Sequence, residues 1–344
     1  MKAGLNPRLY EMPFDQFGRY YIAYSIITEL MAAEPNTQVT ILDIGGYRGS
    51  LQKFFQNEKR VKITTLDIYE NIADKDYIHG SALAIPFDDN TFDFTVSFEV
   101  FEHIKRSDRE KYITEATRVT KNPFILTAPF SGREDEVGHA EIALDSLWRQ
   151  VNGTAHPWLE EHIAYKTPKT NELEEILRVQ KLQFQRFGNN PLPLWDLMQA
   201  FTFLRTTYTD HADDVALQRF YNLHLAELES NAQHYYRYVY LISKQKLKTK
   251  PAILSVPPVT SEQRGKATTD LVVQLFKRLQ HDIMNIITTK NQEITDKDNL
   301  LAKRHRQVAQ LEHELATQQE AVNELLASKS WKIARAMSKL NPKK

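Results

Sequence analysis

The sequence contains no cysteine among its 344 residues. Without thiols the chain cannot form disulfides, use a cysteine nucleophile or bind zinc through cysteine. Disulfides are rare in the reducing cytoplasm, so their absence here suits a cytoplasmic protein.

The sequence also lacks a surplus of charge of either sign and any long apolar run. Lys plus Arg and Asp plus Glu each number 44, so the whole chain carries no excess positive charge that would attract nucleic acid. No window approaches the ~20 apolar residues that cross a bilayer, and the N-terminus lacks the apolar core of a signal peptide. We therefore expect a soluble protein, or one attached at most to a membrane surface.

Strand and helix patterns alternate through most of the chain. Apolar residues at helical spacing predict a first helix over 14–33, and a β-rich run at 39–44 predicts a buried strand that ends in a glycine loop. Further strands are predicted at 61–66, 92–98, 124–128, 183–187 and 235–242, with helices from 50 and 111 and a helical insertion over 194–228. This alternation predicts an α/β fold with a doubly wound, mostly parallel sheet.

The strongest chemical signal is Asp-Ile-Gly-Gly-Tyr-Arg-Gly at 43–49, between a strand and a helix. Glycines let the backbone approach a ligand closely. The loop departs from the dinucleotide pattern G-x-G-x-x-G because Tyr47 stands at a required glycine. Asp67 ends the next strand, where a carboxylate can accept both hydroxyls of an adenosine ribose. The alternative is that Asp67 only caps its loop.

Four stretches resemble the class I S-adenosylmethionine-dependent methyltransferases of the small-molecule type. They are ILDIGGYRG, TLDIY, GSALAIPFDDNTFDFTVSFEVFEHI and FILTAPF, in that family's order and spacing over about residues 39–130. The resemblance implies a Rossmann-like sheet of seven strands, S-adenosyl-L-methionine as the cofactor and methyl transfer as the activity.

The resemblance also implies roles for residues at the strand ends. Gly45 and Gly49 would pass close to the methionine part of the cofactor, Asp67 would hold the ribose, and Glu99 would lie beside the sulfonium. Ser81 departs from the family, which often has Asp there to contact the adenine amino group. The whole predicted cofactor set is Asp43, Gly45, Gly46, Tyr47, Gly49, Asp67, Ile68, Ser81, Ala82, Leu83, Phe98 and Glu99.

The acceptor site is expected within residues 131–168, which we interpret as a long functional loop rich in His, Trp, Glu and Pro. Methyl transfer needs alignment of donor and acceptor and, for a hydroxyl, a base, for which histidine is suited near neutral pH. The candidate bases are His103, His139, His156 and His162, although the Glu-His pair at 102–103 is often structural in similar enzymes. No metal is expected, because no His-x-x-x-His pair lies on one helix and Pro157 disfavours a helix at His156.

The last hundred residues have a different composition. Prolines and a glycine at 246–268 indicate a linker after a methyltransferase domain of residues 1–245. Apolar residues then recur every seven positions and predict a coiled coil over 269–328, with a basic amphipathic tail at 329–344. They are Ile287, Ile294, Leu301, Val308, Leu315 and Val322. Because the other seam position holds mostly Lys, Arg and Gln, a single solvated helix is the alternative.

The tail carries a second resemblance. The segment Ser328–Met337, SKSWKIARAM, is similar to the S-x-S-W-[RK]-[IL] ending that follows coiled coils in bacterial surface-polysaccharide glycosyltransferases and their companion methyltransferases. With the segment HPWLEEH at 156–162, this implies a glycan or lipid-linked glycan acceptor in polysaccharide or O-antigen biosynthesis.

We therefore expect an O-methyltransferase that acts on a sugar hydroxyl or a terminal sugar phosphate of a surface polysaccharide. The alternatives are a small-metabolite methyltransferase and a non-catalytic scaffold with a degenerate methyltransferase fold. The coiled coil would form a homo-oligomer or bind a glycosyltransferase. The basic tail would contact the inner face of the membrane or an acidic groove on a partner. The alternative is a frayed basic end that binds no partner.

Overall fold

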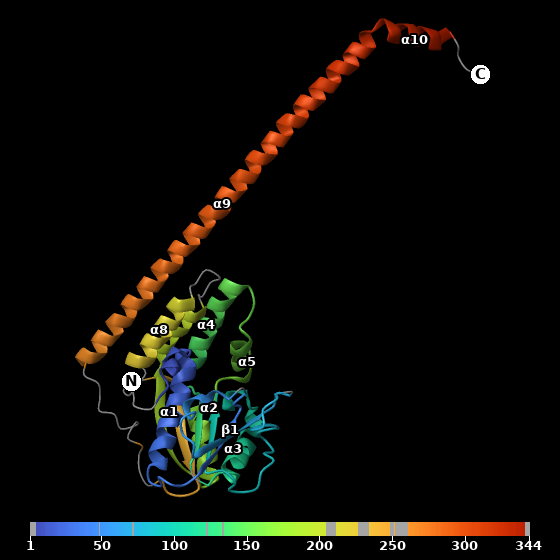
Figure 1. The fold of residues 1–344 in the computed structure, drawn as a ribbon. Helices are drawn as coiled ribbons and strands as arrows, with labels where there is room; N and C mark the ends of the chain where they lie inside the picture. Colours follow the sequence, from blue (N-terminus) through green and yellow to red (C-terminus); the bar gives the residue numbers. More distant parts are fainter. Residues whose placement is uncertain are drawn as a thin grey trace. The chain divides into compact units, whose positions relative to one another are not determined.

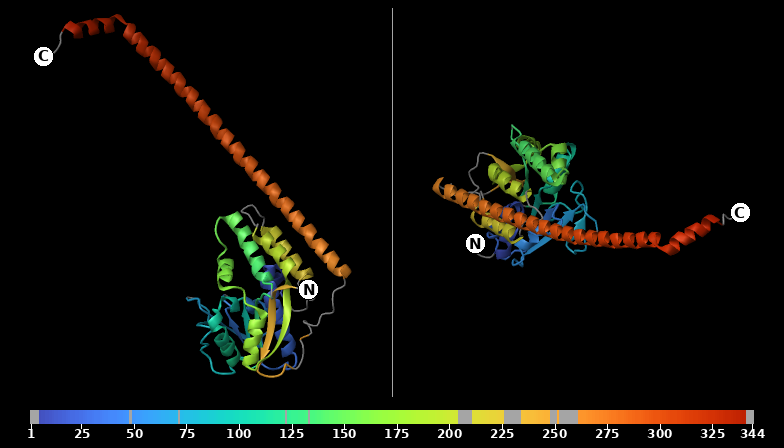
Figure 2. Two further views of the ribbon diagram at one scale, coloured as in Figure 1. Left: turned by 180° about the vertical axis from the view of Figure 1, so that it is seen from behind. Right: turned by 90° about the horizontal axis from the view of Figure 1, so that it is seen from above.

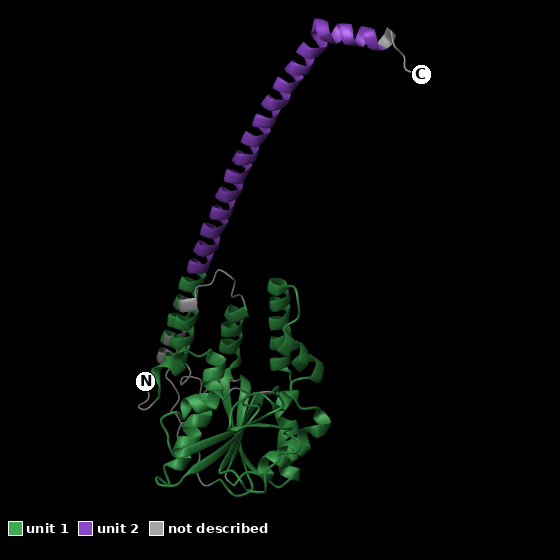
Figure 3. Ribbon diagram, turned by 45° about the vertical axis from the view of Figure 1, so that its right-hand side comes forward, with its two compact units in different colours: residues 1–279 green, residues 280–344 purple. Residues whose placement is uncertain are grey.

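The computed structural model describes residues 5–340 except 48, 71, 122, 133, 204–210, 226–233, 248–250 and 252–260. The chain divides into two compact units, residues 1–279 and residues 280–344, which are coloured green and purple in Figure 3. Each unit is described by itself. The predicted linker at 246–268 lies mostly outside the described residues.

A seven-stranded sheet forms the centre of the first unit, with the strand order β3-β2-β1-β4-β5-β7-β6. Strand β7 is antiparallel to β5 and to β6, and the other pairings are parallel. The strands are β1 (Val39–Ile44), β2 (Val61–Asp67), β3 (Tyr77–His79), β4 (Phe94–Phe98), β5 (Phe124–Pro129), β6 (Gln183–Pro191) and β7 (Tyr235–Ser243). This confirms the predicted doubly wound, mostly parallel, seven-stranded fold.

Helices connect and cover the strands. They are α1 (Phe14–Met31), α2 (Ser50–Phe54), α3 (Arg109–Arg118), α4 (Glu136–Asn152), α5 (Pro157–Tyr165), α6 (Thr170–Val179), α7 (Leu192–Phe203), α8 (His211–His224), α9 (Ser261–Ala327) and α10 (Lys329–Leu340). Short 3-10 turns are η1 (Pro7–Glu11), η2 (Phe101–His103) and η3 (Arg106–Asp108). The long helix thus begins at Ser261, before the predicted start at 269.

Apolar side chains project from both faces of the sheet, so the strand sequences are nearly continuous hydrophobic runs. On β1, Ile41 packs on one face with residues of α1 and α2. Its neighbours Leu42 and Ile44 pack on the other face with residues of α3 and α6. The two layers fix the strand ends relative to each other, and the site described below lies at those ends.

A third apolar cluster forms a helical cap at the carboxyl ends of the strands. It joins α4, α7 and α8 with the first turns of α9, where Leu271 and Leu275 are fully buried. Figure 1 shows α4, α5 and α8 at one end of the sheet, and Figure 2 shows the same cap from behind and from above. Arg278 of α9 also pairs with Asp214 of α8 at 2.9 Å, and the first compact unit extends to Leu279. The domain boundary at 245 stays a prediction.

The segment 131–168 was expected to be a loop, and that expectation was wrong. It contains α4 and α5, and Ser131 pairs with Lys169 in an isolated bridge. Pro157 disfavours a helix at His156, as predicted: His156 is an extended N-cap, and α5 begins at Pro157, where the missing N–H of proline is not needed. The predicted insertion over 194–228 contains α7 and α8, and its residues 204–210 and 226–228 lie outside the described residues.

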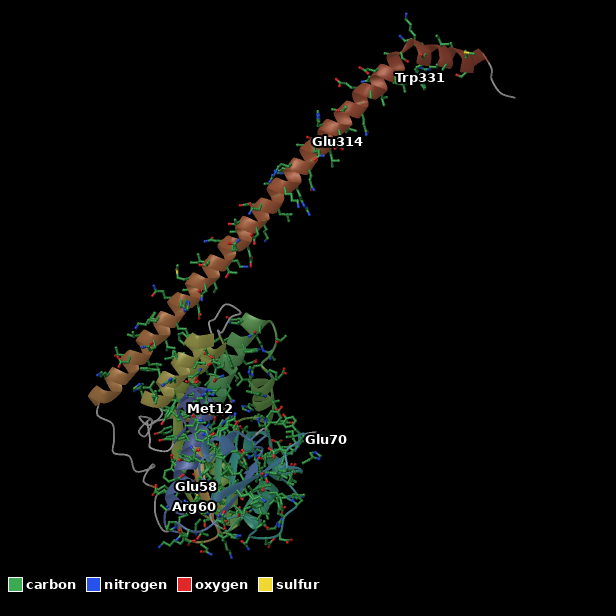
Figure 4. The ribbon with its side chains drawn as sticks, viewed as in Figure 1. Met12, Glu58, Arg60, Glu70, Glu314 and Trp331 are labelled. Carbon is green, nitrogen blue, oxygen red and sulfur yellow. The ribbon has the colours of Figure 1, made fainter. Side chains whose placement is uncertain are left out.

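The second unit consists of α9 from residue 280 onward and α10. The apolar residues at the seven-residue spacing are all exposed, from Ile287 to Val322. Figure 4 shows side chains projecting from α9 around Glu314 and from α10 around Trp331. None of the helices in the described part of the chain is both long enough and apolar enough to cross a membrane.

Candidate functional site

The glycine loop after β1 has a backbone that requires glycine. Gly45 and Gly49 have φ angles of 75° and 70°, in the left-handed region that strains residues with a Cβ. A Cβ on Gly45 would lie 2.2 Å from Cγ2 of Val100, and one on Gly46 would lie 2.3 Å from Oδ2 of Asp43. The loop therefore presents backbone atoms at the carboxyl end of β1, as the sequence predicted.

Asp43 is a fully buried carboxylate on β1, directly before this loop. Neither of its oxygens has a hydrogen-bond partner among the described residues. Burial, together with the nearby charge of Asp67, raises the pKa of Asp43 to about 8, and Arg19 opposes the shift. A buried carboxylate without a partner is costly for a fold, so a cationic group is the chemical complement of this position.

Asp67 lies at the end of β2, beside the glycine loop. Its Oδ2 accepts a hydrogen bond from the backbone N–H of Tyr47 at 2.8 Å, and its Oδ1 accepts one from Ile68 at 2.7 Å. Each carboxylate oxygen has a further lone pair, so Asp67 can still accept bonds from a ligand. Tyr47 and Gly49 also line a cavity of 360 Å³ together with Thr65, Asp74 and Tyr77.

The remaining predicted cofactor residues follow β3 and β4. Ser81 is exposed in a turn after β3, where its Oγ accepts a hydrogen bond from the N–H of Leu83 at 3.2 Å, and Ala82 lies between them. Phe98 is buried at the end of β4. Since β3, β2, β1 and β4 are neighbours and parallel, all the predicted cofactor residues lie along one edge of the sheet.

Glu99 follows β4 and is held by buried arginines. Its carboxylate accepts hydrogen bonds from Nε and Nη2 of Arg237 at 3.1 and 3.3 Å, and Arg19 lies 3.7 Å away. Arg237 is completely buried and also pairs with Asp15 of α1. Burial alone would raise the pKa of Asp15, but Arg237 and Arg19 outweigh it and lower that pKa to about 2. Glu99 has a φ of 53°, which strains a residue other than glycine.

Two of the four predicted bases come together next to Glu99. Nε2 of His103, in η2, lies 3.4 Å from Nε2 of His162, on α5. Nδ1 of His162 lies 2.8 Å from Oε1 of Glu141, and Nδ1 of His103 lies 3.2 Å from Oε2 of Glu161. Two histidines far apart in the chain thus face each other, each oriented by its own carboxylate.

The charges of this pair differ with their surroundings. Burial would lower the pKa of His162, but its hydrogen bond to the carboxylate of Glu141 raises it to about 9. Burial and the neighbouring His162 lower the pKa of His103. Glu102 points into the same cluster with 1% of its surface exposed, and burial with the charge of Glu99 raises its pKa to about 8.

The other two predicted bases lie outside this cluster. His139 is exposed on α4. His156 is the N-cap of α5, its ring stacks on Phe203 at 4.9 Å between centroids, and its Nδ1 accepts a weak bond from the N–H of Leu159. His156 therefore has a structural place at the start of α5.

Several contacts of the site could not be predicted from any local sequence pattern. Arg237 and Glu99 are 138 positions apart, and nothing local links them. Glu141 accepts bonds from His162, from Thr167 and from the hydroxyl of Tyr236, again across long separations. The adjacency of Glu102 to His103 was visible, but only the fold shows that both face His162.

Comparison with known families bears on this edge of the sheet. Residues 42–123 match the family model described as a methyltransferase domain, and the segment runs from the last residues of β1 through β2, β3 and β4 with their loops. These residues therefore carry a methyltransferase domain. The cofactor expected for it from the sequence is S-adenosylmethionine.

The methyltransferase domain is similar in fold to solved structures of low sequence identity. One is the YcgJ protein from Bacillus subtilis, with 15% identity, 65% of this chain and 100% of that chain covered, and a TM-score of 0.37. Another is a putative sarcosine dimethylglycine methyltransferase from Galdieria sulphuraria, with 17% identity, coverage of 64% and 84%, and a TM-score of 0.43. A third is phosphoethanolamine N-methyltransferase 2 from Haemonchus contortus, with 17% identity, coverage of 67% and 58%, and a TM-score of 0.40.

A search of curated proteins found no match to the chain.

The residues of the methyltransferase domain suit this cofactor chemically. The buried, unpartnered carboxylate of Asp43 complements an ammonium group, which the methionine part carries. The side-chain-free loop at Gly45 and Gly46 leaves room for a ligand against the backbone, and Asp67 keeps lone pairs for ribose hydroxyls. These positions would hold the cofactor at the carboxyl ends of β1 and β2.

Proposed function

We propose that the protein is an O-methyltransferase that methylates a sugar hydroxyl, or a terminal sugar phosphate, of a bacterial surface polysaccharide. One observation supports oxygen as the acceptor atom: His103, which follows β4 at the same sheet edge as the glycine loop, faces His162 of α5, and Glu161 and Glu141 orient the two rings. A hydroxyl must give up its proton when its oxygen is methylated, and the imidazole of His103 can receive it.

The residues of the domain have separable tasks in this proposal. Asp43, Asp67 and the glycine loop bind the cofactor. When bound, S-adenosylmethionine supplies a methyl group that is already activated on its sulfonium. Arg237 and Arg19 fix Glu99 between the two halves of the site. The cluster of Glu102, His103 and His162 receives the acceptor, and it opens to solvent at His103, whose side chain is 30% exposed. Catalysis then rests mainly on alignment of donor and acceptor.

An exposed aromatic side chain beside the cluster supports a sugar as the acceptor. Trp158 lies one helical turn before His162 on α5 and is 69% exposed. A large apolar ring on the surface usually has a binding partner, and an aromatic face suits the apolar face of a sugar ring.

The second unit supports a place near membrane-bound glycan assembly. Apolar residues at a seven-residue spacing stay exposed along α9, which suits pairing with another helix of this chain or of a glycosyltransferase. The last helix, α10, carries Trp331, Ile333 and Met337 among basic residues and has no acidic residue. That composition suits anionic lipid headgroups on the inner face of the membrane.

The test is transfer of labelled methyl from S-adenosylmethionine to two acceptor pools from the same cells, lipid-linked glycans and small metabolites. The proposal predicts label in the glycan pool. Label confined to the metabolite pool would favour a small-metabolite enzyme and contradict the proposal.

A variant pair sharpens this test. Trp158→Ala should raise KM for the glycan while leaving kcat within about twofold, because the ring binds the acceptor away from the reacting atoms. Trp331→Ala, an equal change on α10, should leave KM for a detergent-solubilised glycan unchanged. Equal effects of the two changes would argue against Trp158 as an acceptor contact.

A further inference from the structure

The histidine cluster brings two ring nitrogens face to face. Both Nδ1 atoms face carboxylates, Nδ1 of His162 toward Glu141 and Nδ1 of His103 toward Glu161. In neutral imidazoles this arrangement places the hydrogens on Nδ1. The two Nε2 atoms, 3.4 Å apart, then face each other with lone pairs.

The carboxylate of Glu102 adds a third group with free lone pairs to this cluster. Neither carboxylate oxygen of Glu102 has a hydrogen-bond partner within the described part of the chain, although its side chain is buried. One oxygen of Glu102 and one ring nitrogen each of His103 and His162 lie within 4.8 Å of one another. A proton shared by the two histidines would join their nitrogens, but it would leave Glu102 buried without a partner.

The geometry points to a site for one divalent transition-metal ion, held by Glu102, His103 and His162, and we propose this as a new feature of the enzyme. Two nitrogens bound to one ion at about 2.0–2.1 Å in a tetrahedral arrangement lie about 3.3–3.4 Å apart, which is the spacing of the two Nε2 atoms. A carboxylate oxygen of Glu102 lies within 4.8 Å of both nitrogens and supplies the third ligand atom of the proposed site.

The surroundings of the two histidines match those of metal ligands. Histidines that bind a metal through one nitrogen usually donate the other N–H to a carboxylate, which fixes the ring and raises its basicity. Glu141 and Glu161 do this for His162 and His103. Glu141 is itself held by the Tyr236 hydroxyl at 3.0 Å and by Thr167 at 3.2 Å.

The donor set also indicates which ions bind and what they do. Two imidazoles and one carboxylate suit Zn²⁺, Co²⁺, Fe²⁺ or Mn²⁺ and leave coordination positions open. This deepens the proposed function, on which it rests for the role of the ion. With the ion bound, the histidines are ligands and no longer receive the proton: the ion would lower the pKa of an acceptor oxygen in an open position, and the hydroxyl proton would pass to water.

No metal was expected from the sequence because it has no His-x-x-x-His pair on one helix. That pattern requires both ligands on one helix. Here the two histidines come from η2 and α5, 59 positions apart, and only the contact between these two elements brings them together.

The test is calorimetric titration of chelator-treated, full-length protein with Mn²⁺, Co²⁺ and Zn²⁺. We expect one ion per chain. Glu102→Gln and His162→Asn should abolish the binding heat, and Glu141→Gln should weaken binding about 10- to 100-fold, the scale for partners of ligands. His305→Asn, which removes an exposed histidine from α9, is the matched control and should bind as the unmodified protein does.

Each outcome bears on the proposal. Absence of binding heat with all three ions, or equal affinity in Glu102→Gln and the unmodified protein, would overturn it. Glu102→Gln replaces a buried carboxyl group whose oxygens have no partner in the described part of the chain, so thermal unfolding of this variant in chelator should be unchanged or improved, which separates ligand loss from misfolding. Full methyl transfer in excess chelator would also overturn the role of the ion. Ion binding without any methylation of glycan would support the site and count against the proposed function.

Discussion

Replacing Asp43 with asparagine should remove a pH dependence of stability that this carboxylate imposes. Asp43 is fully buried, and its pKa is raised from 3.8 to about 8 by burial and by Asp67. The folded protein therefore holds this proton more tightly than the unfolded chain does. The sign follows: stability is highest below about pH 4 and falls as the pH rises toward 8, because the unfolded state has already lost the proton.

The size of the effect follows from the shift. Each pKa unit corresponds to about 1.4 kcal/mol, so a shift of roughly four units approaches about 5 kcal/mol by pH 8. Asparagine at position 43 cannot ionise. We therefore expect the variant to equal the unmodified protein near pH 4 and to exceed it in free energy of unfolding by about 2–5 kcal/mol at pH 8. Urea unfolding of both proteins at pH 4, 5, 6, 7 and 8 without cofactor measures the two differences.

Asp93 provides a control with the opposite sign. Its carboxylate accepts bonds from the backbone N–H and hydroxyl of Thr40 and from Lys121, and these bonds overcome the effect of burial and lower its pKa. Asp93→Asn should therefore destabilise the protein at pH 7, and the loss should shrink as the pH falls. An Asp43→Asn difference that stays constant from pH 5 to pH 8 would refute the account of Asp43 as a buried, unpaired acid.

Three further changes test other parts of the structure. Asp67→Ala should cost about 1.5–3 kcal/mol in binding of S-adenosylhomocysteine, the scale for hydrogen bonds to a charged group, and unchanged calorimetric affinity would refute the ribose assignment. Gly45→Ala should lower the free energy of unfolding by about 1–2 kcal/mol because of its positive φ, and further because the new Cβ clashes with Val100. In urea unfolding, the double variant Gly45→Ala with Val100→Ala should regain only the part of the stability that the clash removed. Leu301→Glu with Leu315→Glu should reduce the mass of the full-length protein by light scattering to that of one chain. The control variant Arg306→Glu with His313→Glu, on the opposite side of the heptad, should keep the mass of the unmodified protein. A single-chain mass for the unmodified protein would contradict a coiled coil.

The common position of the proposed cofactor residues at one edge of the sheet could be predicted because these residues lie in short segments at strand ends. A glycine loop, an aspartate after the next strand and the ends of β3 and β4 are each visible locally. Parallel strands in the order β3-β2-β1-β4 then bring those segments to one edge. No long-range contact had to be known beyond the topology itself.

The acceptor half could not be predicted in the same way. Its central contacts join Glu141 to His162, His103 to His162 and Arg237 to Glu99, all across long sequence separations. The helices α4 and α5 were missed because residues 131–168 were interpreted from composition. The burial of Leu271 and Leu275 in the cap could not be predicted, because both residues also continue the pattern of the long helix.

Mass spectrometry of the surface polysaccharide tests the central claim most directly. Glycan would be compared from cells with the gene, without it, and with the gene restored as unmodified protein or as the His162→Asn variant. The account predicts that one O-methyl group disappears without the gene, returns with the unmodified protein and stays absent with His162→Asn, although that variant still binds S-adenosylhomocysteine. Identical methylation of the glycan in all four strains would contradict the account.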